Sequence, residues 1–320
     1  MNVNIKKVYS TVKNNLSQVI VGKDRVTDLA VISLLCGGHM LLDDVPGTGK
    51  TVFAKTFASS LSLEFKRVQC VPDMLPSDVI GVNFFDMKLS EFRFIPGPVF
   101  TGILLADEVN RAMPKTQSGL LECMEERQVS VDGKTYHIPA PFMVIATQNP
   151  LETKGTFELP EAQLDRFLVK TEMGYPTHEE NVEILRRKLC AKTPEITDTV
   201  SGEEVLAAME ELGQIYLHDD VLDYAASIVE ATRTGSDVML GASPRALIHL
   251  VQVARGYAAL AERDHVLPDD VKSAAAPVLS HRIIFRNNFQ LDRNKPAEYI
   301  KKILEAVPVP TENIDFTRRG

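Results

Sequence analysis

The glycine-rich segment Pro46-Gly-Thr-Gly-Lys-Thr51 constrains this chain most strongly, because an apolar run precedes it and a helical pattern follows it. The run His39–Leu42 has the composition of a buried strand, and Lys50–Leu61 repeats apolar residues at helical spacing. A strand, a glycine turn and Lys-Thr at a helix start are typical of a loop that holds phosphate groups. Because glycine lets backbone N–H groups converge on one anion, the segment predicts a phosphate-binding loop.

Each residue of this loop has an expected task. Lys50 would neutralise oxygens of the β- and γ-phosphates of a nucleoside triphosphate, and Thr51 would offer its hydroxyl to Mg²⁺. The partial positive charge of the helix N-terminus adds to the attraction. A chance Gly-Thr-Gly-Lys-Thr in an ordinary loop is the alternative. The residues predicted to surround the nucleotide here are Pro46, Gly47, Thr48, Gly49, Lys50, Thr51 and Val52.

Asp44 departs from the general phosphate-loop pattern GxxxxGK[ST], which has glycine at this position. Aspartate tolerates left-handed backbone better than most residues, so the turn can form with it. Its carboxylate is then expected to face away from the phosphates or to accept hydrogen bonds from neighbouring N–H groups. We therefore keep the prediction of a phosphate site.

Two adjacent carboxylates follow another apolar run. Ile103–Ala106 has the pattern of a buried strand and ends at Asp107 and Glu108. Ionised carboxylates there need a nearby cation, and ligands of open parallel sheets bind at this edge. Asp107 is therefore predicted to hold Mg²⁺, directly or through water, and Glu108 to polarise the attacking water as general base. A solvated acidic loop is the alternative.

A third apolar run, Phe142–Thr147, is followed by Gln148 and Asn149. An amide at this strand end can orient the attacking water or contact the γ-phosphate, so Asn149 is a candidate catalytic residue. By itself the pair would be an ordinary polar strand end.

Arg245 is placed where an anion would stabilise it. Ser243-Pro-Arg245 predicts a helix that begins at Pro244, with Ser243 as its N-cap. The helix dipole disfavours a cation in the first turn, so a negative partner is expected. A nucleotide phosphate and a carboxylate in a surface salt bridge are the two candidates.

Arg166 stands just before the apolar run Phe167–Thr171. It either pairs locally with Asp165 or Glu161, or reaches across a subunit boundary as an arginine finger. Arg111, close behind the acidic pair, is a second candidate for a contact between subunits.

The chain has 320 residues, which is enough for two domains. Over residues 1–175 short apolar runs alternate with helical patterns, which predicts an α/β domain with a parallel sheet. The runs are His39–Leu42, Phe65–Cys70, Ile103–Ala106, Phe142–Thr147 and Phe167–Thr171. From residue 176 the strand signals stop, and capping boxes at Thr177–Glu180 and Ser201–Glu204 begin helices, which predicts a helical domain over 176–320. The helices expected there span about 178–191, 202–212, 219–233, 244–262, 268–279 and 297–306.

The composition argues against several other classes of protein. A net charge of −8 does not suit binding to nucleic acid through overall basicity. The four cysteines are scattered and no HxxxH or HExxH spacing occurs, so disulfides, a zinc site or a histidine-held metal are not expected. No apolar run reaches the roughly 18 residues of a membrane helix. We therefore expect a cytoplasmic protein without membrane insertion.

The order of these features resembles the AAA+ ATPases, and the details resemble the MoxR group within them. That group commonly has an acidic residue at the position of Asp44. The resemblance implies a three-layer αβα core with a parallel sheet and a C-terminal all-helical lid. The resembling stretches, within about residues 20–250, are GHMLLDDVPGTGKT, PDMLPSDVIG, FRFIPGPVFTGILLADEVNRAMPKTQSGLLECMEERQVSVDG, PFMVIATQNPLETKGTFELPEAQLDRF and GASPRA.

The resemblance also implies a role for each matched residue. Gln69 stands at the position that restrains the catalytic glutamate in many AAA+ proteins, and Val21 and Gly22 lie in the segment that packs against adenine. The other implied assignments are Walker A for Lys50 and Thr51, Walker B for Asp107 and Glu108, sensor 1 for Asn149, arginine finger for Arg166, and sensor 2 for Arg245.

Two insertions are expected to distinguish this branch of the family. One is Phe84–Phe100, within the second helix of the core, and the other is a hairpin over Gln128–Ile138 that turns at Asp132-Gly133. Both have aromatic stems and polar tips. In the family such projections face a ring pore or a partner, and packed surface loops are the alternative.

The resemblance further implies a function. It predicts Mg²⁺-dependent conversion of ATP to ADP by a homo-oligomeric ring, with a hexamer as the expected size. The ring would remodel or mature client or adaptor proteins, among them proteins with a von Willebrand factor A domain. The alternatives are a motor for metal insertion into a cofactor, as in magnesium chelatase, a nucleic-acid motor, and a nucleotide-gated binding module with little turnover.

Overall fold

The computed structural model describes residues 3–43, 45, 47–149, 155–189, 196, 198–286 and 294–310. Among these residues the main sheet is five-stranded and parallel, with strand order β2-β5-β8-β1-β9. Each strand coincides with an apolar run that predicted one, so the parallel sheet is confirmed. The strands are β1 (Met40–Asp43), β2 (Phe65–Gln69), β5 (Ile103–Asp107), β8 (Met143–Gln148) and β9 (Val169–Thr171).

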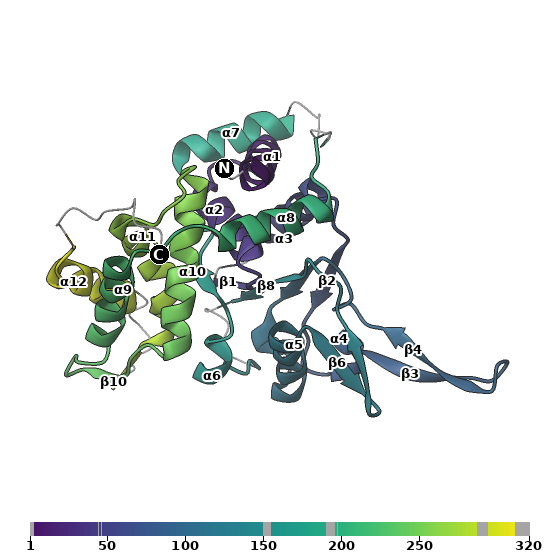
Figure 1. Ribbon diagram of the computed structural model, residues 1–320. Helices are drawn as coiled ribbons and strands as arrows, with labels where there is room; N and C mark the ends of the chain where they lie inside the picture. The colour runs from purple at the N-terminus through teal and green to yellow at the C-terminus, as the bar shows by residue number, and fades with distance from the viewer. Residues whose placement is uncertain are drawn as a thin grey trace.

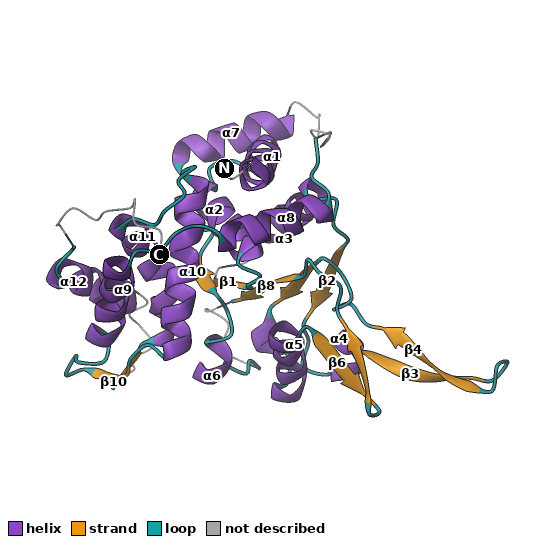
Figure 2. Cartoon of the chain, viewed as in Figure 1, coloured by secondary structure: helices purple, strands orange, loops and turns teal. Residues whose placement is uncertain are grey.

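Helices cover both faces of this sheet. Alternate side chains of a strand point to opposite faces, so Leu42 and Leu105 join one core cluster, whereas Leu41 and Leu104 join the other. The covering helices are α1 (Val3–Val19), α2 (Asp24–Leu35), α3 (Lys50–Ser60), α4 (Pro76–Ile80) and α5 (Pro114–Glu126). The first three lie over one face and the last two against the other, which confirms the three-layer αβα core (Figure 1, Figure 2).

The second half of the chain is mainly helical, as predicted. Thr177 and Glu180 form the expected capping box at the start of the first of these helices, with bonds of 2.9 and 3.2 Å. In the described ranges no helix combines the length and the apolar composition needed to cross a membrane. The helices of this half are α7 (His178–Leu189), α8 (Gly202–Gly213), α9 (Asp219–Ala231), α10 (Pro244–Leu260), α11 (Pro268–Leu279), α12 (Lys295–Ala306) and the 3₁₀ turn η2 (Ser280–Arg282). The short helix α6 (Glu161–Leu164) and the 3₁₀ turn η1 (Val109–Arg111) belong to the first half.

The prediction that strands stop at residue 176 is wrong in one detail. The strands β10 (Val238–Leu240) and β11 (Ile284–Phe285) pair as a short antiparallel ribbon between the helices. Strands of this length carry too few residues for an alternating pattern to be recognised in the sequence.

Buried apolar side chains form one continuous cluster across the predicted domain boundary. Val8 and Val12 of α1 share this cluster with Val205 and Ala208 of α8, and α8 also contacts α2. The first helices of the second half are therefore tied to the first half. The division into residues 1–175 and 176–320 stays a prediction.

The predicted hairpin over 128–138 is present as β6 (Gln128–Val131) and β7 (Lys134–His137). Asp132 and Gly133 at its turn both have positive φ, of 49° and 76°. This backbone geometry matches the twist of two paired strands, which explains why Asp-Gly marks the turn.

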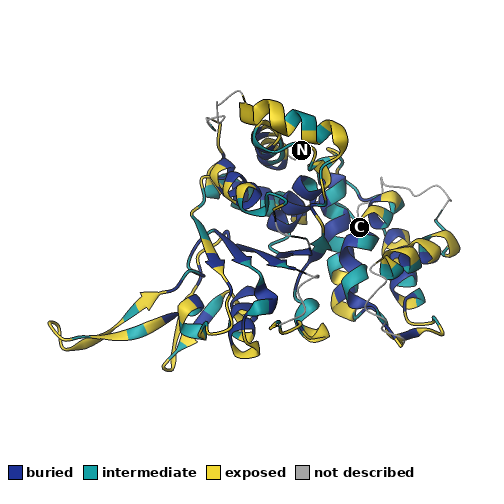
Figure 3. Cartoon of the chain, turned by 180° about the vertical axis from the view of Figure 1, so that it is seen from behind, coloured by how far each residue is buried: buried dark blue, intermediate teal, exposed yellow. Residues whose placement is uncertain are grey.

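The other insertion differs from its prediction. It is a hairpin of β3 (Gly81–Asp86) and β4 (Glu91–Pro96), and it follows α4 directly instead of interrupting a helix. Its tip exposes Met87 (85%) and Leu89 (57%) beside the polar residues Lys88 and Ser90, so the expected polar tip is present only in part. Both hairpins project from the core, and much of their surface is exposed (Figure 3). Because few of their side chains are buried, their sequences carry only a weak apolar pattern of the kind that predicts a strand.

Candidate functional site

The phosphate loop lies between β1 and α3, as predicted. Gly47 and Gly49 have φ of 87° and 90°, backbone conformations that strain any residue with a side chain. A Cβ at either position would meet no described atom within 4 Å, so conformation and not crowding requires glycine. Gly49 is the N-cap of α3, whose first-turn N–H groups can therefore receive an anion. Asp44 and Pro46 lie outside the described residues.

Lys50 folds back over this loop. Its Nζ donates to the carbonyl of Val45 at 3.0 Å, and Thr48 Oγ1 donates to the same oxygen at 3.4 Å. Thr51 and Val52 follow Lys50 in the first turn of α3. These residues lie at the end of β1 where the sequence predicted them, and their contact with phosphate stays a prediction.

Asp107 lies at the same edge of the sheet as the phosphate loop. The strands that lead to them, β5 and β1, flank β8, so their ends are separated by roughly two strand spacings, about 10 Å. Asp107 Oδ1 accepts a hydrogen bond from Thr147 Oγ1 at 2.6 Å, and its Oδ2 lies 2.7 Å from Arg67 Nη2. The predicted metal ligand is thus held on both oxygens by neighbouring strands.

Glu108 has a left-handed backbone, with φ 57° and ψ 52°. Such residues are uncommon outside glycine and cluster at functional sites. Its Oε2 accepts hydrogen bonds from Gln69 Nε2 at 2.8 Å and from Arg111 Nη1 at 3.0 Å. Its N–H donates to Thr147 Oγ1 at 2.9 Å. The structure therefore contains the Gln69 contact that the family resemblance implied, and Arg111 pairs with Glu108 inside this chain.

Sequence reasoning missed Arg67 and Thr147, which hold the predicted carboxylates. Arg67 stands two positions before Gln69 on β2, so both side chains leave the same face, and the register pairs Gln69 with Asp107. Arg67 Nη2 also donates to Gln69 Oε1 at 2.7 Å. Two features of the sequence could have indicated these residues. Polar Arg67 and Gln69 alternate with apolar Val68 at the end of β2, and Thr147 places a hydroxyl in the apolar run of β8.

Asn149 follows β8 and is buried. Its backbone oxygen accepts a hydrogen bond from Asn110 Nδ2 at 3.3 Å. Because β8 lies between β5 and β1, the end of this strand lies between the carboxylates and the phosphate loop. The position agrees with the prediction, and the catalytic role remains one.

A cavity of about 630 Å³ opens beside the end of β1, between the two halves of the chain. Asp43 and Lys170 line one side as an ion pair of 2.6 Å, and Pro277 and His281 line another. Its volume lies within the range of small-molecule sites, about 300–1,000 Å³.

The predicted adenine segment borders this cavity through Gly22. Gly22 has φ 67°, and Glu180 of α7 occupies the place where a Cβ would point. Val21 lines a neighbouring cavity of about 200 Å³ together with Gly22. A side chain at position 22 would strain this left-handed backbone and displace the Glu180 carboxylate, which accounts for the glycine.

Arg166 and Arg245 meet at one carboxylate, that of Glu125 near the end of α5. Arg166 Nε lies 3.1 Å from Glu125 Oε2, and Arg245 Nη2 donates to Glu125 Oε1. The negative partner of Arg245 in this chain is therefore a carboxylate. Arg166 pairs with Glu125 instead of with Asp165 or Glu161, because α5 packs beside the segment that carries it.

This arginine pair lies at the edge of the sheet opposite the phosphate loop. His39, directly before β1, contacts the carbonyl of Met124 at 2.9 Å, next to Glu125. Since a strand rises about 3.3 Å per residue, the loop at the other end of β1 is more than about 10 Å away. This geometry does not support a contact between Arg245 and a nucleotide that is bound by Lys50 of the same chain. The nucleotide roles of both arginines stay predictions that need a second copy.

Comparison with known proteins identifies relatives of the whole chain. Residues 39–169 match the "ATPase family associated with various cellular activities (AAA)", and residues 230–303 match the AAA lid domain. YeaC, an uncharacterized protein of Bacillus subtilis, is 42% identical over 299 residues, 93% of each chain. Chaperone MoxR1 of Mycobacterium tuberculosis is 39% identical over 307 residues, 93% of this chain and 81% of that protein. A crystal structure of a provisionally assigned ATPase from Cytophaga hutchinsonii is 37% identical, with TM-score 0.88 over 97% of both chains.

Proposed function

This chain belongs to the MoxR group of AAA+ ATPases, and on that premise we propose that it couples Mg²⁺-dependent ATP hydrolysis to the remodelling of a partner protein. Membership in the family supports nucleotide binding and ATPase activity in general. The observation that carries the proposal for this chain is the pair Asp107-Glu108. Thr147 and Gln69 hold the pair at the sheet edge that also bears the phosphate loop.

The residues of the loop would bind the nucleotide. Lys50 Nζ would exchange the Val45 carbonyl for β- and γ-phosphate oxygens, and the first-turn N–H groups of α3 would hold further oxygens. The Thr51 hydroxyl and the Asp107 carboxylate form a donor set that fits Mg²⁺, which takes one or two carboxylates with phosphate oxygens and water. When bound, Mg²⁺ supplies positive charge against the phosphates.

Glu108 would accept a proton from the attacking water, and Asn149 would orient that water. Gln69 and Arg111 donate to the same Glu108 oxygen, Oε2. The carboxylate is therefore restrained in the isolated chain. Withdrawal of one of these donors would let the attacking water take its place at Oε2.

The arginine pair supports a proposal of assembly. Arg166 and Arg245 lie at the sheet edge opposite Lys50, so a nucleotide would meet them only from a second copy of the chain. A contact of this kind joins two different surfaces, and a series of such contacts closes into a ring. We expect a hexamer, in which each subunit offers Arg166 to the site of its neighbour.

The partner is proposed to be a protein. One relative carries the name chaperone, and the β3–β4 hairpin of this chain exposes Phe84, Phe85 and Phe92 as apolar surface for a client or adaptor. Proteins with a von Willebrand factor A domain are the adaptor class that the family resemblance suggests, and the cytoplasm is the proposed compartment. A metallated small-molecule product would instead indicate a chelatase-like motor, and salt-dependent stimulation by DNA a nucleic-acid motor.

The substitution Glu108→Gln tests the proposal. We expect it to retain ATP binding and to lower the hydrolysis rate at least about 100-fold, because it removes the general base. Glu126→Gln, at an exposed position near the end of α5, is the matched control and should hydrolyse ATP normally. Hydrolysis at the wild-type rate by Glu108→Gln would exclude the assigned base. Full activity in monomers, measured over a dilution series, would exclude the ring.

A further inference from the structure

We infer that Arg282, a buried arginine of the helical half, positions the finger segment, Asp165–Leu168, which carries Arg166. This inference rests on the proposed function, in which Arg166 acts on a nucleotide held by a neighbouring copy. Arg282 is a positioning residue in this scheme, because it lies inside its own chain and touches the finger segment instead of the nucleotide.

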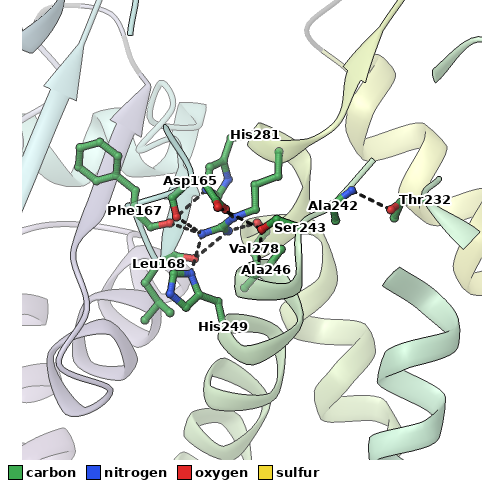
Figure 4. A network of polar contacts seen from close by, with 11 residues as sticks. Asp165, Phe167, Leu168, Thr232, Ala242, Ser243, Ala246, His249, Val278 and His281 are labelled. Carbon is green, nitrogen blue, oxygen red and sulfur yellow. Dashed lines mark hydrogen bonds and ion pairs between the residues drawn. The ribbon is translucent and has the colours of Figure 1, made fainter. Parts of the chain in front are cut away.

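The guanidinium of Arg282 grips the backbone on both sides of Arg166. Its side chain is 2% exposed, and its Nε lies 2.6 Å from Asp165 Oδ1. Nη2 donates to the carbonyls of Asp165 at 3.0 Å and Phe167 at 2.6 Å, and Nη1 donates to that of Leu168 at 3.3 Å. These partners converge in Figure 4. One cation in η2 therefore sets the path of the finger segment as it enters β9.

Asp165 links the same segment to the first turn of α10. Ser243 Oγ donates to Asp165 Oδ2 at 3.0 Å, and it also caps α10 by accepting from the N–H of Ala246 at 3.1 Å (Figure 4). Arg245 lies in that turn. Because Arg166 and Arg245 also share one carboxylate, both arginines rest on one polar network that Arg282 anchors.

The chemistry around Arg282 suits a fixed position. Burying a guanidinium is strongly unfavourable unless carboxylates and carbonyls accept its hydrogen bonds, as they do here. His249 Nδ1 at 2.6 Å and the carbonyl of Val278 complete the set of acceptors. Burial, together with the Arg282 cation, lowers the pKa of His249 to about 4, so the ring is neutral and can accept. Any displacement of the finger segment would take from this buried charge its carboxylate and three of its carbonyl partners.

A second arginine of the same half provides a matched control. Arg263 meets Asp270 through hydrogen bonds of 2.7 and 2.6 Å, and this pair joins the end of α10 to α11, away from the finger segment. Replacing either arginine by methionine removes an ion pair to an aspartate, although the Arg263 side chain is 26% exposed and that of Arg282 only 2%. Only Arg282→Met should displace Arg166.

The first experiment compares Arg282→Met and Arg263→Met, both checked by circular dichroism and thermal unfolding. Arg282→Met should retain ATP affinity and lose about 10- to 100-fold in kcat, as expected for a misplaced catalytic group. Arg263→Met should retain kcat. If Arg282→Met does not fold, Asp165→Asn and Asp270→Asn are the milder pair, with loss of kcat expected only for Asp165→Asn. Equal kcat values within a pair would overturn the inference.

The second experiment asks whether the defect lies in the finger that a subunit offers. Lys50→Met subunits have a defective phosphate loop and an intact finger, so mixing them with Arg282→Met subunits should raise hydrolysis above the sum of the two. Mixing Lys50→Met with Arg166→Ala shows that subunits exchange. A gain in that mixture without a gain for Arg282→Met would overturn the inference.

These results separate the inference from the proposed function. If Arg166→Ala alone leaves kcat unchanged, the finger assignment of the proposed function fails. If Arg166→Ala lowers kcat while Arg282→Met does not, the proposed function stands and the positioning role of Arg282 is excluded.

Discussion

Gln69 donates a hydrogen bond of 2.8 Å to Glu108 across the neighbouring strands β2 and β5. Arg111 donates to the same carboxylate oxygen at 3.0 Å. The residue proposed as general base is thus held by two donors from its own chain. Activation of hydrolysis then means the release of Glu108, and the strength of this restraint can be measured.

We expect Gln69→Ala to raise unstimulated ATP hydrolysis by about tenfold, since a hydrogen bond to a charged group contributes about 1.5 kcal/mol. ATP affinity should not change, because Gln69 lies on β2 and not in the phosphate loop. The measurement is steady-state hydrolysis at saturating ATP. Gln18→Ala, exposed on α1, is the control. A lower rate in Gln69→Ala would instead show that Gln69 assists the reaction.

Arg67 competes with the proposed metal for Asp107. Its Nη2 lies 2.7 Å from Asp107 Oδ2, so Arg67→Met should lower the Mg²⁺ concentration required for half-maximal hydrolysis. The shift should be at most about fivefold, because a partly exposed ion pair is worth up to about 1 kcal/mol. A Mg²⁺ titration of the hydrolysis rate checks this. Arg93→Met, which removes an ion pair to Asp86 on the β3–β4 hairpin, should leave the titration unchanged.

Lys50→Met should lower the affinity for ATP by about 10- to 100-fold. This loss corresponds to the binding free energy that hydrogen bonds to a charged group usually contribute. Equilibrium titration with a fluorescent ATP analogue measures this directly. Lys55→Met changes an exposed lysine one turn further along α3 and provides the control. Equal affinities for the two variants would show that the nucleotide does not bind at this loop.

His39 makes folding stability depend on pH. Its Nδ1 accepts from the N–H of Val144 at 2.9 Å and its Nε2 donates to Met124, which requires the neutral ring. Burial lowers the pKa of His39 from 6.5 to about 4. Between these values the unfolded state binds more protons, so the free energy of unfolding falls as pH falls from 6.5 towards 4.

The contribution of His39 to this slope is at most about 1.4 kcal/mol per pH unit. His39→Gln can keep both hydrogen bonds without titrating, so denaturant unfolding should show a shallower pH dependence for this variant. Some slope should remain, because burial also lowers the pKa of His249 to about 4. An unchanged slope in His39→Gln would contradict the assignment.

The phosphate loop and the acidic strand end could be predicted because their chemistry is contiguous in the chain. A strand, a glycine turn and a helix start are neighbours in sequence, so Gly47, Gly49 and Lys50 identify the loop without tertiary information. Asp107 and Glu108 follow their strand directly. The same holds for the Asp132-Gly133 turn, whose backbone angles depend only on those residues.

The amino-acid sequence by itself determined the parallel sheet, the loop at the end of β1 and the helices of the second half, since local spacing and burial encode them. Only the tertiary structure decided the partners of the charged groups. Arg67 reaches Asp107 because β2 lies beside β5, and Glu125 joins Arg166 to Arg245 because α5 ends beside β9 and α10. An ion pair depends on which distant elements become neighbours, and no local pattern carries that information.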